Sequence, residues 1–142
     1  MFRSQDRLFI EIHFIHYLVG IAMKIPATSR TPAVEFLPGL CTIKGECYPE
    51  DITEFSAPVI GHLKEGISSA EEYKVEIELY YFNSSSAKFF YDFFEFLDES
   101  ASEGTKIEVV WRHREDDDTM EEAGEEFEED LDHVNFTLES IG

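Results

Sequence analysis

The segment from Lys74 to Ser86 constrains the fold more than any other part of the chain. Lys74 to Leu79 alternates strictly between polar and apolar residues, and Tyr80 to Phe82 follows as an apolar run. This pattern predicts a strand with one face on a core and burial on both sides near its end. Asn83-Ser84-Ser85-Ser86 comes next and opens a phenylalanine-rich pattern with helical spacing. Several hydroxyl groups are therefore expected where a sheet strand is followed by a helix.

The junction between this strand and the helix is the best candidate for the functional site. The first turn of a helix has unpaired backbone N–H groups and the positive end of the helix dipole, so it holds an added phosphate with little rearrangement. We therefore predict a phosphorylation switch at this position. A hydroxyl such as that of Ser84 is also often an ordinary helix N-cap, and this alternative stays open at the sequence level.

Composition limits the kind of protein that carries such a switch. The chain has 142 residues, of which 43% are apolar and 14% aromatic, which is enough for one core and predicts a single domain. Its formal net charge of -20 argues against nucleic acid or an anionic membrane as a partner, because both repel a negative field. A basic protein surface is the more natural counterpart.

The chain offers little for enzyme chemistry or metal binding. It has no Gly-rich phosphate loop, no Gly-x-Ser-x-Gly elbow and no His-Glu-x-x-His pair, so we predict no catalytic residues and no cofactor. His13, His16, Cys41 and Cys47 lack the paired spacings of a zinc site. Asp116 to Asp118 lacks the glycine and the distal glutamate of a calcium loop, and is interpreted as a solvated turn. The two cysteines form no disulfide framework, which fits a reducing cytoplasm.

Residues 1 to 22 form a separate segment in the sequence. Leu8 to Ala22 is apolar enough to suggest a signal peptide, but Glu11 and two histidines interrupt it, and it is shorter than the roughly 20 apolar residues of a membrane span. We expect Met23 to be the native start, with residues 1–22 as an annotation extension or a loose arm and 23–142 as the domain. A signal or anchor, or an integral element, are the alternatives, and the intact mass of the native protein decides between them.

The remaining pattern predicts about five strands with helices between them. Pro38-Gly39 separates two strand-like runs, Ala33 to Leu37 and Leu40 to Glu46, as in a hairpin. Apolar residues from Ile52 to Ile67 recur near helical spacing, and the helix is expected to begin close to Pro58. Further strands are expected at Lys106 to Trp111 and Asn135 to Ile141, with a docked acidic helix within Glu115 to Asp132. This order predicts an α/β fold with a mixed sheet and at least one right-handed parallel crossover.

The helix expected from Ser85 to Ser102 has more apolar surface than a single contact face needs. Phe89, Tyr91 and Phe96 widen its apolar arc beyond the stripe of about 100° that a surface helix requires. Two explanations remain open. Either a neighbouring helix of the same domain covers the surplus, or a partner protein docks there beside the serines.

Several motifs together resemble a known family. The motifs, in chain order, are Thr31-Pro32-Ala33, Gly45-Glu46-Cys47-Tyr48-Pro49-Glu50-Asp51, Leu79-Tyr80-Tyr81-Phe82-Asn83-Ser84-Ser85-Ser86-Ala87-Lys88, Val109-Val110-Trp111 and Asp118-Thr119-Met120-Glu121-Glu122-Ala123-Gly124-Glu125-Glu126-Phe127. From about Thr31 to its end, the chain resembles the SiaC family of bacterial regulatory phosphoproteins. The Tyr-Pro-Glu and Tyr-x-Asn-Ser-Ser-Ser segments are the specific parts of the resemblance.

The resemblance implies a STAS-like domain, similar to anti-sigma-factor antagonists, in a partner-switching circuit. A serine/threonine kinase of the anti-sigma-factor type phosphorylates such a protein, and a PP2C-type phosphatase restores it. In the best-known member, the unphosphorylated form binds and activates a diguanylate cyclase, which controls cyclic di-GMP and biofilm behaviour. The family phosphosite, the hydroxyl residue after the asparagine, maps to Ser84, where the family pattern has threonine. Ser85 and Ser86 are the alternative acceptors.

The residue pattern and the family resemblance together predict a partner-binding surface around the phosphosite. It consists of Asn83, Ser85, Ser86, Lys88, Phe89 and Phe96. Lys88, one turn into the helix, is expected to approach a phosphate on Ser84. Two competing functions remain: an acidic adaptor that binds a basic protein without phosphorylation, and a small hydrolase with an unrecognised site.

Overall fold

The computed structural model describes residues 23–142, so the predictions for residues 1–22 lie outside the described residues. Six strands and three helices make up the described part. The strands are β1 (Met23–Ile25), β2 (Ala33–Leu37), β3 (Leu40–Cys47), β4 (Glu72–Phe82), β5 (Lys106–Arg114) and β6 (Asn135–Ile141), and the helices are α2 (Ile52–Ser68), α3 (Ser84–Ser102) and α4 (Asp118–Glu129).

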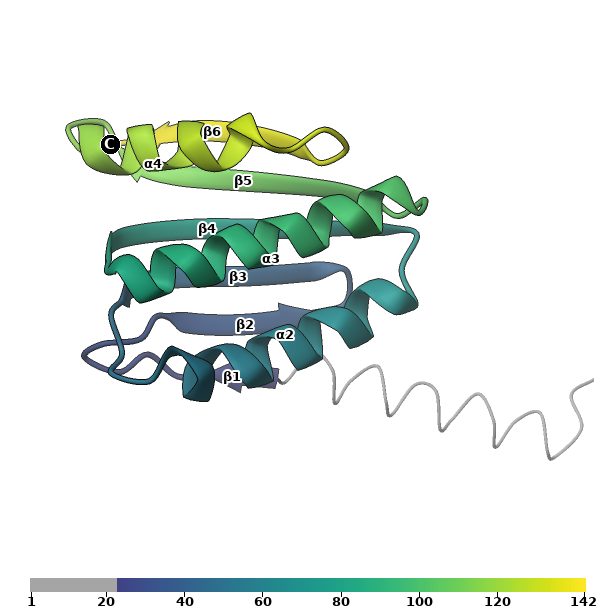
Figure 1. Ribbon diagram of the computed structural model, residues 1–142, viewed down its shortest axis with the longest axis horizontal. Coiled ribbons are helices and arrows are strands. Elements are labelled where there is room, and N and C mark those ends of the chain that lie inside the picture. Colours follow the sequence, from purple (N-terminus) through teal and green to yellow (C-terminus); the bar gives the residue numbers. More distant parts are fainter. Residues whose placement is uncertain (1–22) are drawn as a thin grey trace, which may run out of the picture.

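The strands form one mixed sheet whose spatial order is the chain order (Figure 1). The β1–β2 and β2–β3 pairs are antiparallel, whereas the β3–β4, β4–β5 and β5–β6 pairs are parallel and are connected through α2, α3 and α4. The predicted α/β fold with parallel crossovers is therefore confirmed. The strand count of about five misses β1, because its three residues are too few to show a periodic pattern, although Met23 and Ile25 pair with Phe36 and Val34.

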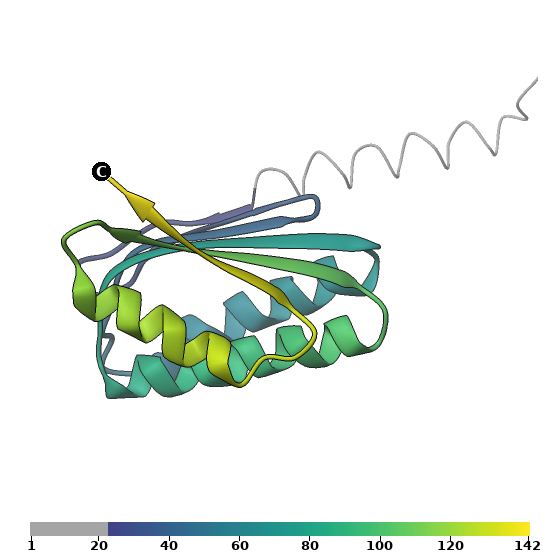
Figure 2. The ribbon, with the colours of Figure 1, turned by 90° about the horizontal axis from the view of Figure 1, so that it is seen from above.

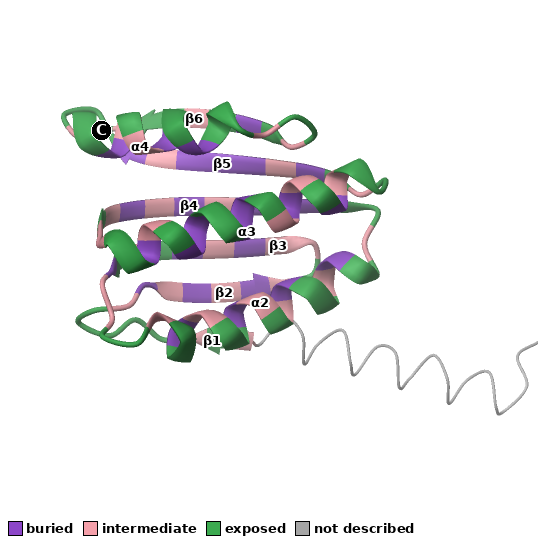
Figure 3. Ribbon diagram, viewed as in Figure 1, coloured by how far each residue is buried: buried purple, intermediate pink, exposed green. Residues whose placement is uncertain are grey.

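All three described helices cover the same face of the sheet, as Figure 2 shows. The core lies between that face and the helices, and the buried stretches in Figure 3 follow the helix sides turned toward the strands. Its largest fully buried side chains include Trp111 of β5 and three phenylalanines of α3, Phe90, Phe93 and Phe94. These rings pack α3 against the sheet, because Phe90 contacts Phe82 of β4 and Phe94 contacts Trp111 of β5.

The prediction that α2 begins near Pro58 is wrong, because the helix begins at Ile52 and contains Pro58. The side chain of Asp51 caps the helix by accepting a hydrogen bond of 3.0 Å from the backbone N–H of Thr53. A proline inside a helix costs about 3 kcal/mol. Each large apolar side chain that a helix buries contributes about 1.5–3 kcal/mol, which outweighs this cost when four are buried. The four buried side chains of α2 are Phe55, Val59, Leu63 and Ile67.

The face of the sheet opposite the helices carries charged side chains in cross-strand pairs. Arg112 on β5 lies 2.9 Å from a carboxylate oxygen of Glu76 on β4 and 3.2 Å from one of Glu139 on β6. These ion pairs join three parallel strands, and the hydrogen bond from Arg112 is the main cause that lowers the pKa of Glu76. This face is therefore polar, in keeping with the strict alternation that predicted β4.

The contact between α4 and β5 depends on a glycine. The indole N–H of Trp111 donates a hydrogen bond of 2.9 Å to the carbonyl oxygen of Met120, so the indole ring lies directly under α4. A Cβ atom placed on Gly124 would lie 2.5 Å from the indole Cδ1, well inside van der Waals contact. Only a residue without a side chain fits at this position.

We expect Gly124→Ala to lower the free energy of unfolding by about 1–3 kcal/mol, because the added methyl group overpacks against the indole ring of Trp111. Gly61→Ala is the matched control, since Gly61 is exposed in the middle of α2 and a Cβ there meets nothing within 4 Å. The control should raise the free energy of unfolding by about 0.5–1 kcal/mol through helix propensity. Urea titrations of both variants provide the measurement, and equal effects would contradict the packing explanation.

Candidate functional site at the carboxyl edge of the parallel strands

The candidate site lies where the parallel strands end and the helices begin. The first turns of α2, α3 and α4 follow the carboxyl ends of β3, β4 and β5, and all three lie at the left edge in Figure 1. The backbone N–H of Asn83 donates a hydrogen bond of 3.2 Å to the carbonyl oxygen of Cys47. This bond fixes the end of β4 and the start of α3 against the loop that follows β3.

The serines of the junction occupy three different environments. Asn83 is the N-cap of α3, since its side-chain oxygen accepts a hydrogen bond of 3.0 Å from the backbone N–H of Ser86. The ordinary-cap alternative for Ser84 is therefore wrong. Ser84 is the first helical residue, and both Ser84 and Ser85 are exposed, whereas Ser86 is 0% exposed. Successive helical residues point about 100° apart, which places Ser86 on the core face with Phe90.

Cys47 and Ser86 meet beneath the junction. Both side chains are buried, one at the end of β3 and the other in the first turn of α3. Among residues 23–142, no group satisfies the Ser86 hydroxyl with good hydrogen-bond geometry. Burial raises the pKa of the Cys47 thiol, although contact with the Ser86 hydroxyl opposes part of that rise. Burial raises the pKa of Cys41 to about 12, so both cysteines are protonated and unreactive at neutral pH.

The electrostatics of the first turn of α3 differ from those of the other helices. The first turns of α2 and α4 contain acidic side chains, whereas the first turn of α3 contains none. The chain has 31 acidic residues, so an acid-free turn stands out against its surroundings. Lys88 is exposed four residues after Ser84, on the same side of the helix. Of the three described helices, α3 therefore has the first turn that repels an added anion least.

An aromatic pair that the sequence did not single out as a site lies beside the serines. Tyr81 on β4 is 49% exposed, and its ring packs edge-on against Tyr48, with ring centroids 5.6 Å apart. Tyr48 lies in the loop after β3. Three residues earlier, within β3, the backbone at Gly45 adopts φ +136° and the pairing with β4 shifts register. Glycine is suited to this φ, and a Cβ there would lie 3.2 Å from the Cα of Pro32. Both tyrosines lie within the motifs that resemble the family, and this is the sequence signal from which the pair could have been found.

Two phenylalanines expected to contact a partner are covered within the domain. Phe89 is 7% exposed and packs against Phe55 of α2, with ring centroids 6.0 Å apart. Phe96 is half-buried, and the Lys64 ammonium group of α2 lies 5.5 Å from its ring centroid. Helix α2 therefore covers this flank of α3. For Phe89 and Phe96, the apolar surplus is covered by a neighbouring helix of the same domain.

The described residues meet neither the requirements of a metal site nor those of a membrane-spanning helix. Between residues 23 and 142, no group of three histidine, cysteine or carboxylate side chains is placed to hold a metal ion. None of the helices in this range combines the length and the apolar character needed to cross a lipid bilayer.

Known proteins are similar to this chain in sequence and fold. Residues 25–141 match the family model described as SiaC family regulatory phosphoprotein. A protein of Pseudomonas aeruginosa (strain UCBPP-PA14) is 28% identical over 111 residues, which cover 76% of this chain and 88% of the relative. Apo-SiaC from Pseudomonas aeruginosa has a crystal structure that superposes with a TM-score of 0.73 at 28% identity, covering 82% of this chain and 97% of that chain.

A second solved structure contains the same fold in a complex. It is the crystal structure of the diguanylate cyclase SiaD in complex with its activator SiaC, also from Pseudomonas aeruginosa. One chain of it has a TM-score of 0.74 at 25% identity and covers 82% of this chain and 99% of that chain.

Proposed function

Because this chain belongs to the SiaC family of regulatory phosphoproteins, we propose that it is a non-enzymatic switch whose partner is selected by phosphate on Ser84. The observation that carries the proposal is the exposed Ser84 hydroxyl at the first position of α3, in a first turn without acidic residues. Ser85, which is also exposed, is the second choice. The buried hydroxyl of Ser86 reaches a kinase only if the first turn of α3 opens.

Unphosphorylated, the first turn of α3 presents uncharged polar side chains at the carboxyl edge, between the acidic first turns of α2 and α4. Ser84, Ser85 and the ring of Tyr81 are exposed there, and Asn83 is partly exposed. Tyrosine is enriched at protein-binding surfaces, where it often supplies a large share of the affinity. The effector proposed for this surface is a diguanylate cyclase, since the related SiaC is the activator of the cyclase SiaD. Ser86 and Phe89 support the surface from below.

Phosphorylation changes the charge of that surface. A kinase of the anti-sigma-factor type transfers the terminal phosphoryl group of ATP to Ser84 Oγ, which loses its proton, and ADP leaves. A PP2C-type phosphatase reverses the change, since attack of water on phosphorus restores the hydroxyl and releases inorganic phosphate. Phosphoserine carries about -1.5 to -2 charges. The helix dipole and Lys88 stabilise these charges in the free domain, whereas an effector surface packed on Tyr81 must remove water from them.

The cellular setting follows from the same features. Cys41 and Cys47 are free thiols, which fits the reducing cytoplasm in which ATP-dependent kinases and cyclases work. The strongly acidic composition fits partners that are proteins, with no direct binding to nucleic acid or anionic membrane. Control of cyclic di-GMP, and through it biofilm formation, is the output proposed for the cyclase branch.

We expect the kinase from the same genome, supplied with ATP, to place phosphate on Ser84. Phosphopeptide mapping should find a single modified residue. Ser84→Ala should reduce incorporation to background, whereas Ser85→Ala, the equally exposed neighbour, should retain it. Both variants should keep the circular dichroism spectrum of the wild type. Phosphate on Ser85 of the wild type would move the assignment, and no phosphate on any of the three serines would leave the phosphorylation-independent adaptor as the function.

A further inference from the structure

A groove between α3 and α4 is the second surface of the domain that has features of a binding site. Its volume is about 450 Å³, and we call it the α3–α4 groove. Phe94 and Phe127 line it but are only 1% and 3% exposed, so its accessible apolar surface comes mainly from Tyr91, which is 42% exposed, and from the partly buried Leu131. The ring of Tyr91 packs edge-on against Phe127, with centroids 4.7 Å apart. The groove is therefore apolar and aromatic at its base.

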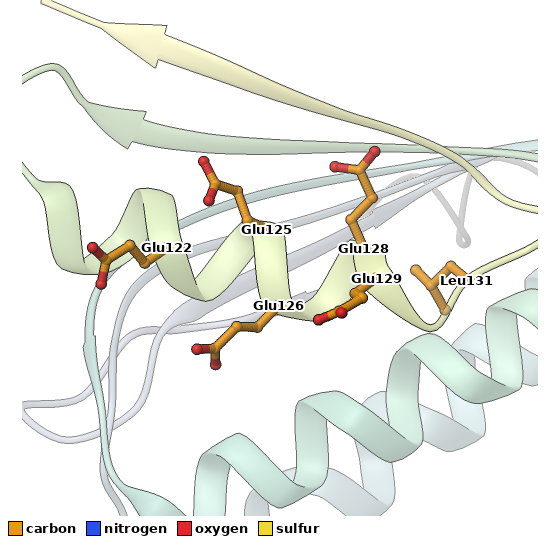
Figure 4. Close-up of a pocket in the computed structure, with 6 residues that line it drawn as sticks. All are labelled: Glu122, Glu125, Glu126, Glu128, Glu129 and Leu131. Carbon is orange, nitrogen blue, oxygen red and sulfur yellow. The ribbon is translucent and has the colours of Figure 1, made fainter.

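Carboxylates surround this apolar base. Glu95 and Glu99 of α3 and Asp130 at the end of α4 line the groove. A second, shallower hollow on α4 shares Leu131 with it and is otherwise lined by five glutamates, shown in Figure 4. Burial raises the pKa of Tyr91, and the nearby charges of Glu126, Asp130 and Glu129 raise it further. The chain has no lysine or arginine from Phe89 to Glu103 or from Glu115 to Asp132.

These charges are unfavourable for the free domain. Both α3 and α4 lack basic residues in the last turn, and acidic side chains occupy those turns instead, among them Glu99 and Glu129. The carboxyl end of a helix is the negative end of its dipole, where each exposed acidic group costs about 0.3–1 kcal/mol. Two parallel helices place both negative ends along the same groove. A bound cation relieves this repulsion, whereas the groove repels anions.

We propose that the α3–α4 groove binds a basic amphipathic helix of a protein partner. Its apolar side chains pack on Tyr91 and Leu131, above the buried rings of Phe94 and Phe127. Its arginine or lysine side chains pair with Glu95, Glu99 and Asp130. Two side-by-side helices provide ridges on which a third helix packs, and an arginine also stacks on an exposed tyrosine ring. A second copy of this chain is a poor occupant because each copy has a formal net charge of -20.

The groove is continuous with the switch along α3. Tyr91 lies seven residues after Ser84, which is two helical turns on the same side of the helix and about 10 Å along its axis. A phosphate on Ser84 therefore adds negative charge about two helical turns before the groove, with Lys88 between them. This phosphate should not weaken a basic occupant of the groove, although it is proposed to expel the effector from the carboxyl edge. The two surfaces thus respond differently to the same modification.

The test uses the unphosphorylated full chain and two labelled peptides of about 18 residues, long enough for five helical turns. One has lysine and arginine on one helical face and leucine on the other, and its twin has serine in place of every leucine. Fluorescence anisotropy should show the leucine peptide binding at least about tenfold more tightly than its twin. Equal affinities would overturn the proposal, because a general attraction between opposite charges does not depend on the leucines.

Two matched variants locate the binding. Glu95→Gln with Asp130→Asn removes two carboxylates from the groove, and Glu54→Gln with Glu65→Gln removes two exposed carboxylates from α2. The groove variant, and separately Tyr91→Ser, should weaken the leucine peptide by about tenfold, while the α2 variant should change its affinity by less than about twofold. Equal weakening by both charge variants, or occupation of the groove by a second copy detected in sedimentation, would sink the proposal. Neither result bears on the switch at Ser84, because no kinase or effector is present.

Discussion

Phosphate on Ser84 is expected to weaken binding of the effector by at least about a hundredfold, which corresponds to about 2.7 kcal/mol. The physical reason is desolvation: the phosphate loses water when an effector surface closes over Tyr81, and it has few cations nearby to replace that water. Calorimetric titration of the diguanylate cyclase from the same genome into unmodified and phosphorylated protein provides the measurement. Phosphoserine is introduced at position 84 during translation, so that the sample is homogeneous.

Ser102 provides the control for charge. It is exposed at the opposite end of α3, about 27 Å from Ser84 along the helix axis. Phosphoserine at position 102 adds the same charge to the same helix and should change effector affinity by less than about threefold. Ser84→Asp, which adds one charge and no phosphate geometry, should cost about tenfold. If the unmodified and Ser84-phosphorylated forms bind the effector equally well, the mechanism is refuted. If phosphate at position 84 and phosphate at position 102 weaken effector binding equally, the effect depends only on the net charge of the domain.

Much of the architecture could be predicted because strong periodic patterns and tertiary packing agree here. The alternation from Lys74 to Leu79 predicted β4, and the ring spacing after Ser86 predicted α3, since both patterns reflect the same buried face. The exceptions occur where a local rule was outweighed by packing. Pro58 was taken as a helix boundary, but the buried stripe of α2 compensates for its missing hydrogen bond. The strand β1 became visible only through its pairing with β2.

At the candidate site too, features set by neighbouring residues in the sequence could be predicted, and contacts between distant segments could not. The junction at Asn83 was predictable, because a capping side chain followed by a helical pattern is a local signal. The burial of Ser86 was also predictable in principle, since stepping back one turn from Phe90 along the helix reaches Ser86. The Tyr48–Tyr81 pair was not, because it depends on a register shift between two strands at Gly45. No periodicity within either segment brings those two rings together.

The exposed ring of Tyr81 yields the second large effect. Tyr81→Ser should weaken the unphosphorylated domain's affinity for the cyclase by about 30-fold, or about 2 kcal/mol, because exposed tyrosines at protein-binding surfaces often dominate affinity. The free energy of unfolding should fall by less than about 1 kcal/mol, since the ring is half-exposed and makes one edge-on aromatic contact. Calorimetric titration gives the affinity, and a urea titration gives the stability.

The neighbouring residue, Tyr80, provides the control for the Tyr81 prediction. Its ring carries the Arg114 guanidinium group at 4.4 Å and belongs to the charged side of the sheet, while Tyr81 contacts Tyr48 at the carboxyl edge. Tyr80→Ser removes a tyrosine of the same size from the adjacent position and should change cyclase affinity by less than about twofold. If both variants weaken binding equally, affinity follows the integrity of β4 and the exposed ring has no special role. If Tyr81→Ser binds as the wild type does, the effector surface lies away from the carboxyl edge, and phosphate at Ser84 has no contact there to disrupt.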